Sequence, residues 1–329
     1  MSTAKPICPE GRPLLSYENP AFVNSPDGRI VRILAEYMEP LAHFRRERIQ
    51  DTVVFFGSAR FRPLDEASCT LELLDSSSSI KLAPTEEQPA TADELASGDA
   101  SQLQRERAEA AVEMARYYED ARKLAYMLTQ WSMSLKFRRH RFVVTSGGGP
   151  GIMEAANRGA TEAGGKTIGL NIRLPFEQSA NPYITPSLCL EFHYFFMRKY
   201  WFAYLAKALV VFPGGFGTLD EMFELLTLAQ TRKLAKEMTI VIYGSQYWKE
   251  IINLEALVAK GTISPQDVNL FQFADTPEAA FALLKDGLTR NHLEPAKKPE
   301  AVGAEQGPDQ PVDEEAEMSL RPEISRTRL

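Results

Sequence analysis

Cysteine and histidine are scarce in this sequence of 329 residues. The three cysteines, Cys8, Cys69 and Cys189, are odd in number and far apart, so they predict neither a disulfide framework nor a zinc ribbon. The four histidines lack the spacing of a metal-binding motif such as H-E-x-x-H. We therefore expect no metal site and no bound cofactor, and a reducing cytoplasmic location.

An excess of positive charge is also lacking. Lys and Arg number 37 against 44 Asp and Glu, which gives a formal net charge of −7. A generic nucleic-acid binder needs a basic surface, so we expect no nucleic-acid partner, although a local basic pocket for one small anion is compatible with this balance. No apolar run is long enough to span a bilayer, so we expect no membrane partner.

What the sequence does contain is an alternation of short apolar strands and helices. The expected strands are 52–56, 141–145, 167–171, 188–192, 209–212 and 239–243, and the expected helices are 29–48, 102–136, 152–163, 195–207, 218–234, 246–260 and 277–288. Such alternation is typical of βαβ units, in which helices cover a parallel sheet. The fold class that we predict is α/β, with a Rossmann-like, doubly wound parallel sheet and helices on both faces.

The same survey predicts how the chain is divided. Residues 1–50 are expected to be an N-terminal arm with a helix that Pro40 breaks. Residues 51–290 form the Rossmann-like domain, and within it residues 61–101 lose all periodic pattern, which predicts a polar, mobile insertion or a hairpin tip. Residues 291–329 are rich in Pro, Glu and Ala and predict a disordered tail.

Two glycine-rich loops of similar design join a strand to a helix. They read TSGGGPGIMEAANRGA (145–160) and FPGGFGTLDEMFELL (212–226). In a doubly wound sheet, ligands lie beyond the carboxyl ends of the strands, where a helix N-terminus offers free N–H groups to a phosphate. The phosphate-binding candidates are Gly148, Gly149, Gly214, Gly215, Gly217 and Thr218. The alternative is that these glycines serve only tight turns. Neither loop is a P-loop or a G-x-G-x-x-G fingerprint.

Residues between and beside these loops add further candidates. In FFGSAR (55–60), Ser58 either contributes to the same site or serves as a helix cap or turn residue. Thr218 and Glu221 match the capping box T-x-x-E, which explains them without any catalysis, and Asp220 fits a solvated charge at a helix start. Arg198 is either a snorkelling cation or a guanidinium that reaches the same crevice.

Together these motifs resemble the Lonely Guy (LOG) family of cytokinin riboside 5′-monophosphate phosphoribohydrolases, which have also carried the name lysine decarboxylase. The segment 213–221, PGGFGTLDE, is similar to P-G-G-x-G-T-x-x-E. The segment 147–153, GGGPGIM, is similar to G-G-G-x-x-G-[LI]-M but is one residue shorter, because only Pro150 separates Gly149 from Gly151. Met197, Arg198 and Lys199 align with the end of M-H-x-R-K, although the histidine of that motif has no equivalent here.

The resemblance implies a nucleoside 5′-monophosphate N-glycosidase that releases a free purine base and ribose 5-phosphate. Arg198 and Glu221 take the positions of the family's catalytic pair, and Ser58, Met197 and Lys199 are further candidates for substrate contact. It also implies a homodimer or larger homo-oligomer. The base specificity stays open: adenine, N6-modified adenine or several bases.

Two other classes of function compete with this interpretation. One is a non-catalytic nucleotide or molybdenum-cofactor carrier, because related Rossmann-like proteins share the glycine loops. The other is a pyridoxal phosphate decarboxylase, which needs a Schiff-base lysine, and nothing in the sequence marks Lys199 or Lys207 as one.

Overall fold

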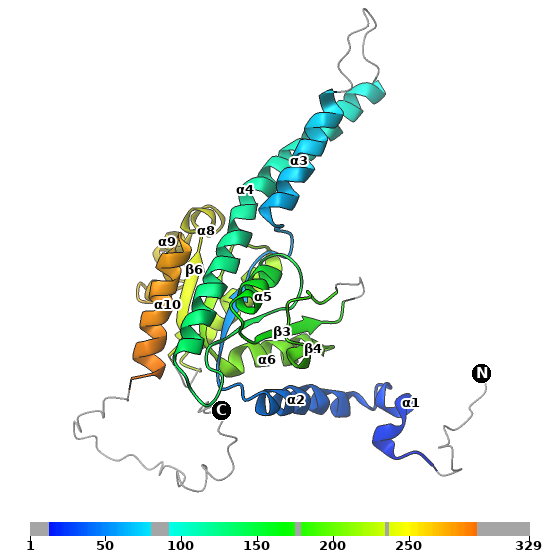
Figure 1. The fold of residues 1–329 in the computed structure, drawn as a ribbon, viewed down its shortest axis with the longest axis vertical. Coiled ribbons are helices and arrows are strands. Elements are labelled where there is room, and N and C mark those ends of the chain that lie inside the picture. Colours follow the sequence, from blue (N-terminus) through cyan, green and yellow to red (C-terminus); the bar gives the residue numbers. More distant parts are fainter. Residues whose placement is uncertain (1–12, 80–91, 175–178, 234–236, 295–329) are drawn as a thin grey trace, which may run out of the picture.

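A computed structural model describes residues 13–79, 92–174, 179–233 and 237–294 of the chain (Figure 1). Its centre is a sheet of seven strands in the order β4-β3-β2-β1-β5-β6-β7, and every neighbouring pair is parallel. The strands are β1 (Thr52–Phe56), β2 (Val143–Ser146), β3 (Thr167–Ile172), β4 (Cys189–Phe192), β5 (Ala206–Val211), β6 (Thr239–Tyr243) and β7 (Gln272–Ala274). The strand order reverses between β1 and β5, so the predicted doubly wound α/β class is confirmed.

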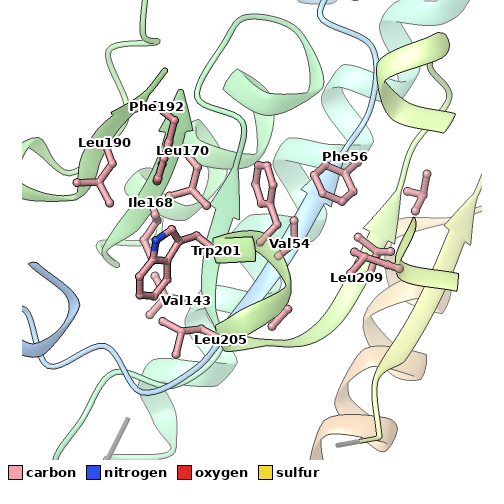
Figure 2. Close-up of a cluster of buried hydrophobic side chains, with 14 of the residues drawn as sticks. Val54, Phe56, Val143, Ile168, Leu170, Leu190, Phe192, Trp201, Leu205 and Leu209 are labelled. Carbon is pink, nitrogen blue, oxygen red and sulfur yellow. The ribbon is translucent and has the colours of Figure 1, made fainter. Parts of the chain in front are cut away.

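Helices cover both faces of the sheet. One face carries α2 (Arg29–Arg46), α6 (Phe195–Leu205), α7 (Phe216–Gln230) and α8 (Ser245–Ile251), and the other carries α4 (Ala92–Ser134), α5 (Ile152–Glu162) and α10 (Pro277–His292). Side chains alternate along β1: Val54 and Phe56 enter the first core, which Figure 2 shows, while Val53 and Phe55 enter the second. Burial on both faces explains why the central strands β1 and β6 are almost wholly apolar, whereas the edge strand β4 alternates between exposed and buried residues.

Helix α2 runs through Pro40, so the expected break there is wrong. Proline has no N–H and leaves the carbonyl of residue i−4 without its helical partner. In this helix that carbonyl belongs to Glu36, and it accepts a hydrogen bond of 2.9 Å from Nε1 of Trp201 on α6. A tertiary contact thus replaces the bond that the proline removes.

The expected loss of structure over 61–101 is wrong for most of that stretch. Helix α3 (Leu64–Ser79) and the first turns of α4 form an antiparallel pair that extends away from the sheet (Figure 1). The small side chains of Ala67 and Ala108 are buried on these two helices. Residues 80–91 of the predicted insertion lie outside the described residues.

Smaller differences concern the ends of elements. The expected helix 246–260 is two helices, α8 and α9 (Leu254–Ala259), because the Asn253 side chain caps a new start by accepting from Ala256 N–H at 2.8 Å. The arm contains η1 (Ser16–Glu18) and α1 (Pro20–Val23), and two more short turns are η2 (Pro186–Leu188) and η3 (Asp267–Leu270). The predicted tail lies outside the described residues from 295 on. Among the described helices, none has the length and apolarity to cross a membrane.

Candidate active site

The turn after β1 joins the two glycine loops. Ser58 N–H donates to the carbonyl of Pro213 at 3.0 Å, and the Ser58 carbonyl accepts from Ile152 N–H at 3.0 Å. The Ser58 hydroxyl accepts from Arg60 N–H at 3.1 Å, as in a turn. Three strand ends therefore meet where the strand order reverses, which is the position at which doubly wound sheets bind ligands.

The loop after β5 enters α7 without a side-chain cap. Helix α7 begins at Phe216 with Gly215 as its N-cap residue, and no side chain of the described chain caps it. The capping-box alternative for Thr218 and Glu221 is therefore wrong: Thr218 lies in the first turn, and Glu221 bonds elsewhere. The first N–H groups of α7 are left to a ligand or to water.

The glycines of this loop differ in what surrounds them. A Cβ on Gly214 would lie 2.2 Å from Thr218 Oγ1 and 3.0 Å from Ser58 N, so close packing requires glycine there. A Cβ on Gly215 or Gly217 would meet nothing within 4 Å. Packing within the described chain therefore does not explain the last two glycines.

The loop after β2 is held by buried polar side chains. Gly148 has a φ of +76°, and its N–H donates to Ser146 Oγ at 3.0 Å. The carbonyl oxygens of Gly148 and Gly149 both accept from Nδ2 of Asn181, at 3.1 and 3.0 Å. Of the two predicted phosphate donors on this loop, Gly148 N–H already has a partner, whereas no group of the described residues accepts from Gly149 N–H.

Arg198 and Glu221 form an ion pair between α6 and α7. Nη2 of Arg198 donates to Oε1 of Glu221 at 2.7 Å, and both side chains are largely buried. The guanidinium lies over the rings of Phe195 and Phe202, with its central carbon 5.5 Å from each ring centroid. A Cβ on Gly147 would lie 3.8 Å from Arg198 Nη1, so the first glycine loop borders the pair.

The electrostatics of this pair differ from those of a surface salt bridge. Burial raises the pKa of Glu221 to about 7, and the positive charges of Arg198 and Lys199 only partly oppose it. In the part of the chain that the structure describes, Nε of Arg198 is buried without a hydrogen-bond partner. A carboxyl group that titrates near neutrality beside a guanidinium with a spare donor can exchange a proton and bind an anionic or polar ligand.

The remaining candidates have other surroundings. Met197 is buried in the core beneath α6. The Lys199 ammonium pairs with Asp220 at 2.8 Å and with Glu224 at 2.9 Å, so Asp220, although half exposed, is not only a solvated charge. Contact of Met197 and Lys199 with substrate stays a prediction.

Sequence reasoning missed the side chains that support the first loop. Ser146, Asn157 and Asn181 are buried and bonded to one another. Their signal in the sequence was weak, because Asn181 stands in a proline-spaced stretch far from the loop. The described residues hold no group of three or more His, Cys, Asp or Glu side chains that could bind a metal.

Comparisons with known proteins agree with these motifs. Residues 153–284 match the family model described as possible lysine decarboxylase, a stretch that contains Arg198, Glu221 and the second glycine loop. A probable cytokinin riboside 5′-monophosphate phosphoribohydrolase of Oryza sativa subsp. japonica, LOGL5, is 27% identical over 152 residues, which are 46% of this chain and 61% of the rice protein. LOG1 of Arabidopsis thaliana is 25% identical over 158 residues, 47% of this chain and 73% of that protein.

Among solved structures, the molybdenum cofactor carrier protein of Chlamydomonas reinhardtii is similar. It shares 22% sequence identity, covers 53% of this chain and 89% of its own, and has a TM-score of 0.34. The sequence matches confirm the resemblance to the LOG family. They extend over less than two thirds of the rice relative.

Proposed function

We propose that this relative of the LOG family hydrolyses the N-glycosidic bond of a purine nucleoside 5′-monophosphate, with adenine or an N6-modified adenine as base. The products are the free base and ribose 5-phosphate. The observation that carries the proposal is the buried pair Arg198–Glu221, which lies beside the glycine loops at the switch point of the sheet.

The phosphate end of the substrate is assigned to the glycine loops. The uncapped first turn of α7, at Gly215, Gly217 and Thr218, offers backbone N–H groups and the positive end of a helix dipole. Gly149 N–H is a further donor on the neighbouring loop, and Gly214 shapes the turn. A phosphate bound there leaves the sugar to extend toward Arg198 and Glu221.

Cleavage breaks the bond between the anomeric carbon and the base, and its electron pair leaves with the base. Positive charge then develops on the sugar, as in glycoside hydrolysis. In the proposed mechanism the Glu221 carboxylate stabilises that charge and takes a proton from the attacking water, whose oxygen bonds to the anomeric carbon. Arg198 stays protonated, orients the substrate and stabilises the departing base, which accepts a proton from solvent.

A homodimer or larger homo-oligomer in the cytoplasm belongs to the same proposal. The resemblance supports the oligomer, and exposed aromatic side chains on α6 and α7 are available for contact with a second copy of the chain. These are Phe195, Phe196, Phe216 and Phe223, with exposed fractions of 52%, 50%, 93% and 40%.

The test is release of free base from AMP and from N6-isopentenyl-AMP, followed by chromatography. Wild-type protein should release base, and Glu221→Gln should lose about 10²-fold or more of that activity. The control is Glu250→Gln, an exposed carboxylate on α8 that accepts a hydrogen bond from Gln246, and it should keep the activity. A wild-type protein that binds AMP and yields neither base nor ribose 5-phosphate would instead favour the carrier.

A further inference from the structure

A buried network of uncharged polar side chains stands directly behind the first glycine loop. Ser146 and Asn157 are fully buried, and Asn181 is 7% exposed. Ser146 Oγ bonds to Asn157 Oδ1 at 2.6 Å, and Nδ2 of Asn181 reaches the same Oδ1 at 2.9 Å. Burying such groups is costly unless each finds its partners, so a network this complete holds its members in one arrangement.

The network binds both the N–H and the carbonyl group of Gly148. Ser146 Oγ accepts from Gly148 N–H, while the Gly148 carbonyl accepts twice from Asn181, from Nδ2 at 3.1 Å and from the backbone N–H at 2.8 Å. The Gly149 carbonyl accepts from the same Nδ2 at 3.0 Å. Asn181 therefore draws two successive carbonyl groups toward itself.

This arrangement fixes the direction of one N–H group. In a trans peptide the N–H points opposite to the carbonyl of the same peptide unit. Because the Gly148 carbonyl faces Asn181, the N–H of Gly149 faces away from it, and no group of the described residues accepts from that N–H. Pro150 follows and has no N–H. Gly149 N–H is therefore the donor whose direction the hydrogen bonds from Asn181 fix.

We propose that Asn181 is a positioning residue that aims Gly149 N–H at a phosphate oxygen of the bound nucleotide. The inference deepens the proposed function and rests on it. Asn181 itself touches no substrate atom in this account, because its amide is occupied by the loop carbonyls and by Asn157.

The test uses two variants that cut the network at different ends. Asn181→Leu removes the donors at similar size, and Ser146→Ala removes the hydroxyl that holds Gly148 N–H. In both variants Gly149 N–H should no longer be aimed at the phosphate. Because a hydrogen bond to a charged group is strong, its loss should weaken binding of ribose 5-phosphate about ten- to a hundredfold, as calorimetry would measure. Binding of ribose, which has no phosphate, should change less than twofold, and the KM for AMP should rise more than kcat falls.

The matched control is Tyr183→Phe, two residues beyond Asn181, which removes only a hydroxyl and should bind ribose 5-phosphate like wild type. Melting curves verify that each variant is folded. If either folded variant binds ribose 5-phosphate as tightly as wild type, or loses ribose binding equally, the positioning role is overturned while the proposed function stands. A wild-type protein that neither cleaves AMP nor binds ribose 5-phosphate overturns both.

Discussion

Glu221 accepts a 2.7 Å hydrogen bond from Arg198, and yet burial raises its pKa to about 7. A neighbouring guanidinium normally lowers the pKa of a carboxyl group, so the loss of water around Glu221 outweighs the attraction. The proposed base therefore titrates in the range where an enzyme at neutral pH can use it.

The activity of wild-type protein should fall on the acid side of pH 7. If the Glu221 carboxylate is the active form, kcat/KM for AMP drops by about tenfold per pH unit below the pKa of that group. In Arg198→Gln the positive charge that lowers this pKa is gone, so the acid limb should move to higher pH. If the acid limb of the pH profile stays at the same pH in Arg198→Gln, the titrating group that causes it is not Glu221.

Stability should also depend on pH through Glu221. Its pKa is raised in the folded state above the ordinary value of 4.5 for a glutamate, so the folded chain binds the proton more tightly than the unfolded chain does. Its contribution to the free energy of unfolding is complete below about pH 4.5 and is lost as the pH rises through about 7. The free energy of unfolding of Glu221→Gln, taken relative to that of wild type, should therefore rise by on the order of 3 kcal/mol between pH 4.5 and 8.

Urea denaturation of both proteins at several pH values measures this difference. Asp267 provides a comparison, because hydrogen bonds from Ser264 and Gln230 lower its pKa. Asp267→Asn should show no gain over the same pH range. A Glu221→Gln curve parallel to that of wild type would mean that the carboxyl group keeps an ordinary pKa.

The fold could be predicted because the central strands are buried on both faces. Residues 53–56 of β1 are apolar throughout, and the alternation of such runs with helices leaves few topologies. The errors arose where a tertiary contact decides the outcome. Trp201 donates the hydrogen bond that the Glu36 carbonyl cannot receive from Pro40. The polar helix α3 packs against α4. Neither contact can be predicted from the local sequence.

The candidate site could be predicted in part for the same reason. Glycine loops at strand ends meet at one edge of a parallel sheet, so local motifs suffice to place them near each other. The capping box at Thr218–Glu221 failed because α7 starts earlier, at Phe216. Asn181 was missed because its role comes from a side chain that crosses more than thirty residues of sequence to the Gly148 carbonyl.

Glu36 ties the N-terminal helix to the start of α6, which carries Arg198. Its carboxylate accepts from His193 N–H at 2.7 Å and from Tyr194 N–H at 3.2 Å, directly before the first residue of α6. Glu36→Ala should lower the free energy of unfolding by about 0.5–2 kcal/mol, because two backbone N–H groups lose their acceptor. Glu39→Ala, whose side chain is exposed near His43, should cost less than about 0.5 kcal/mol. Equal costs for the two variants in urea denaturation would contradict the role of the Glu36 carboxylate in holding this junction.

The glycines of the second loop allow stability and ligand binding to be separated. Gly217 is the second residue of α7, has no positive φ, and has open space where a Cβ would stand. Alanine is favoured over glycine within a helix by about 1 kcal/mol, so the fold alone would do better with alanine at this position. Gly217→Ala should therefore raise the free energy of unfolding by about 0.5–1 kcal/mol.

The same variant should impair substrate binding if a phosphate approaches the first turn of α7. The added methyl group would occupy the space of the ligand, and the KM for AMP should rise about tenfold or more, since small displacements of a bound substrate are costly. Gly148→Ala is the contrasting variant: its φ of +76° and the Asn171 Oδ1 atom 2.2 Å from the new Cβ should make it less stable than wild type. A Gly217→Ala protein that is more stable and binds AMP as well as wild type would show that no phosphate lies against this turn, because nothing among the described residues around Gly217 requires a glycine there.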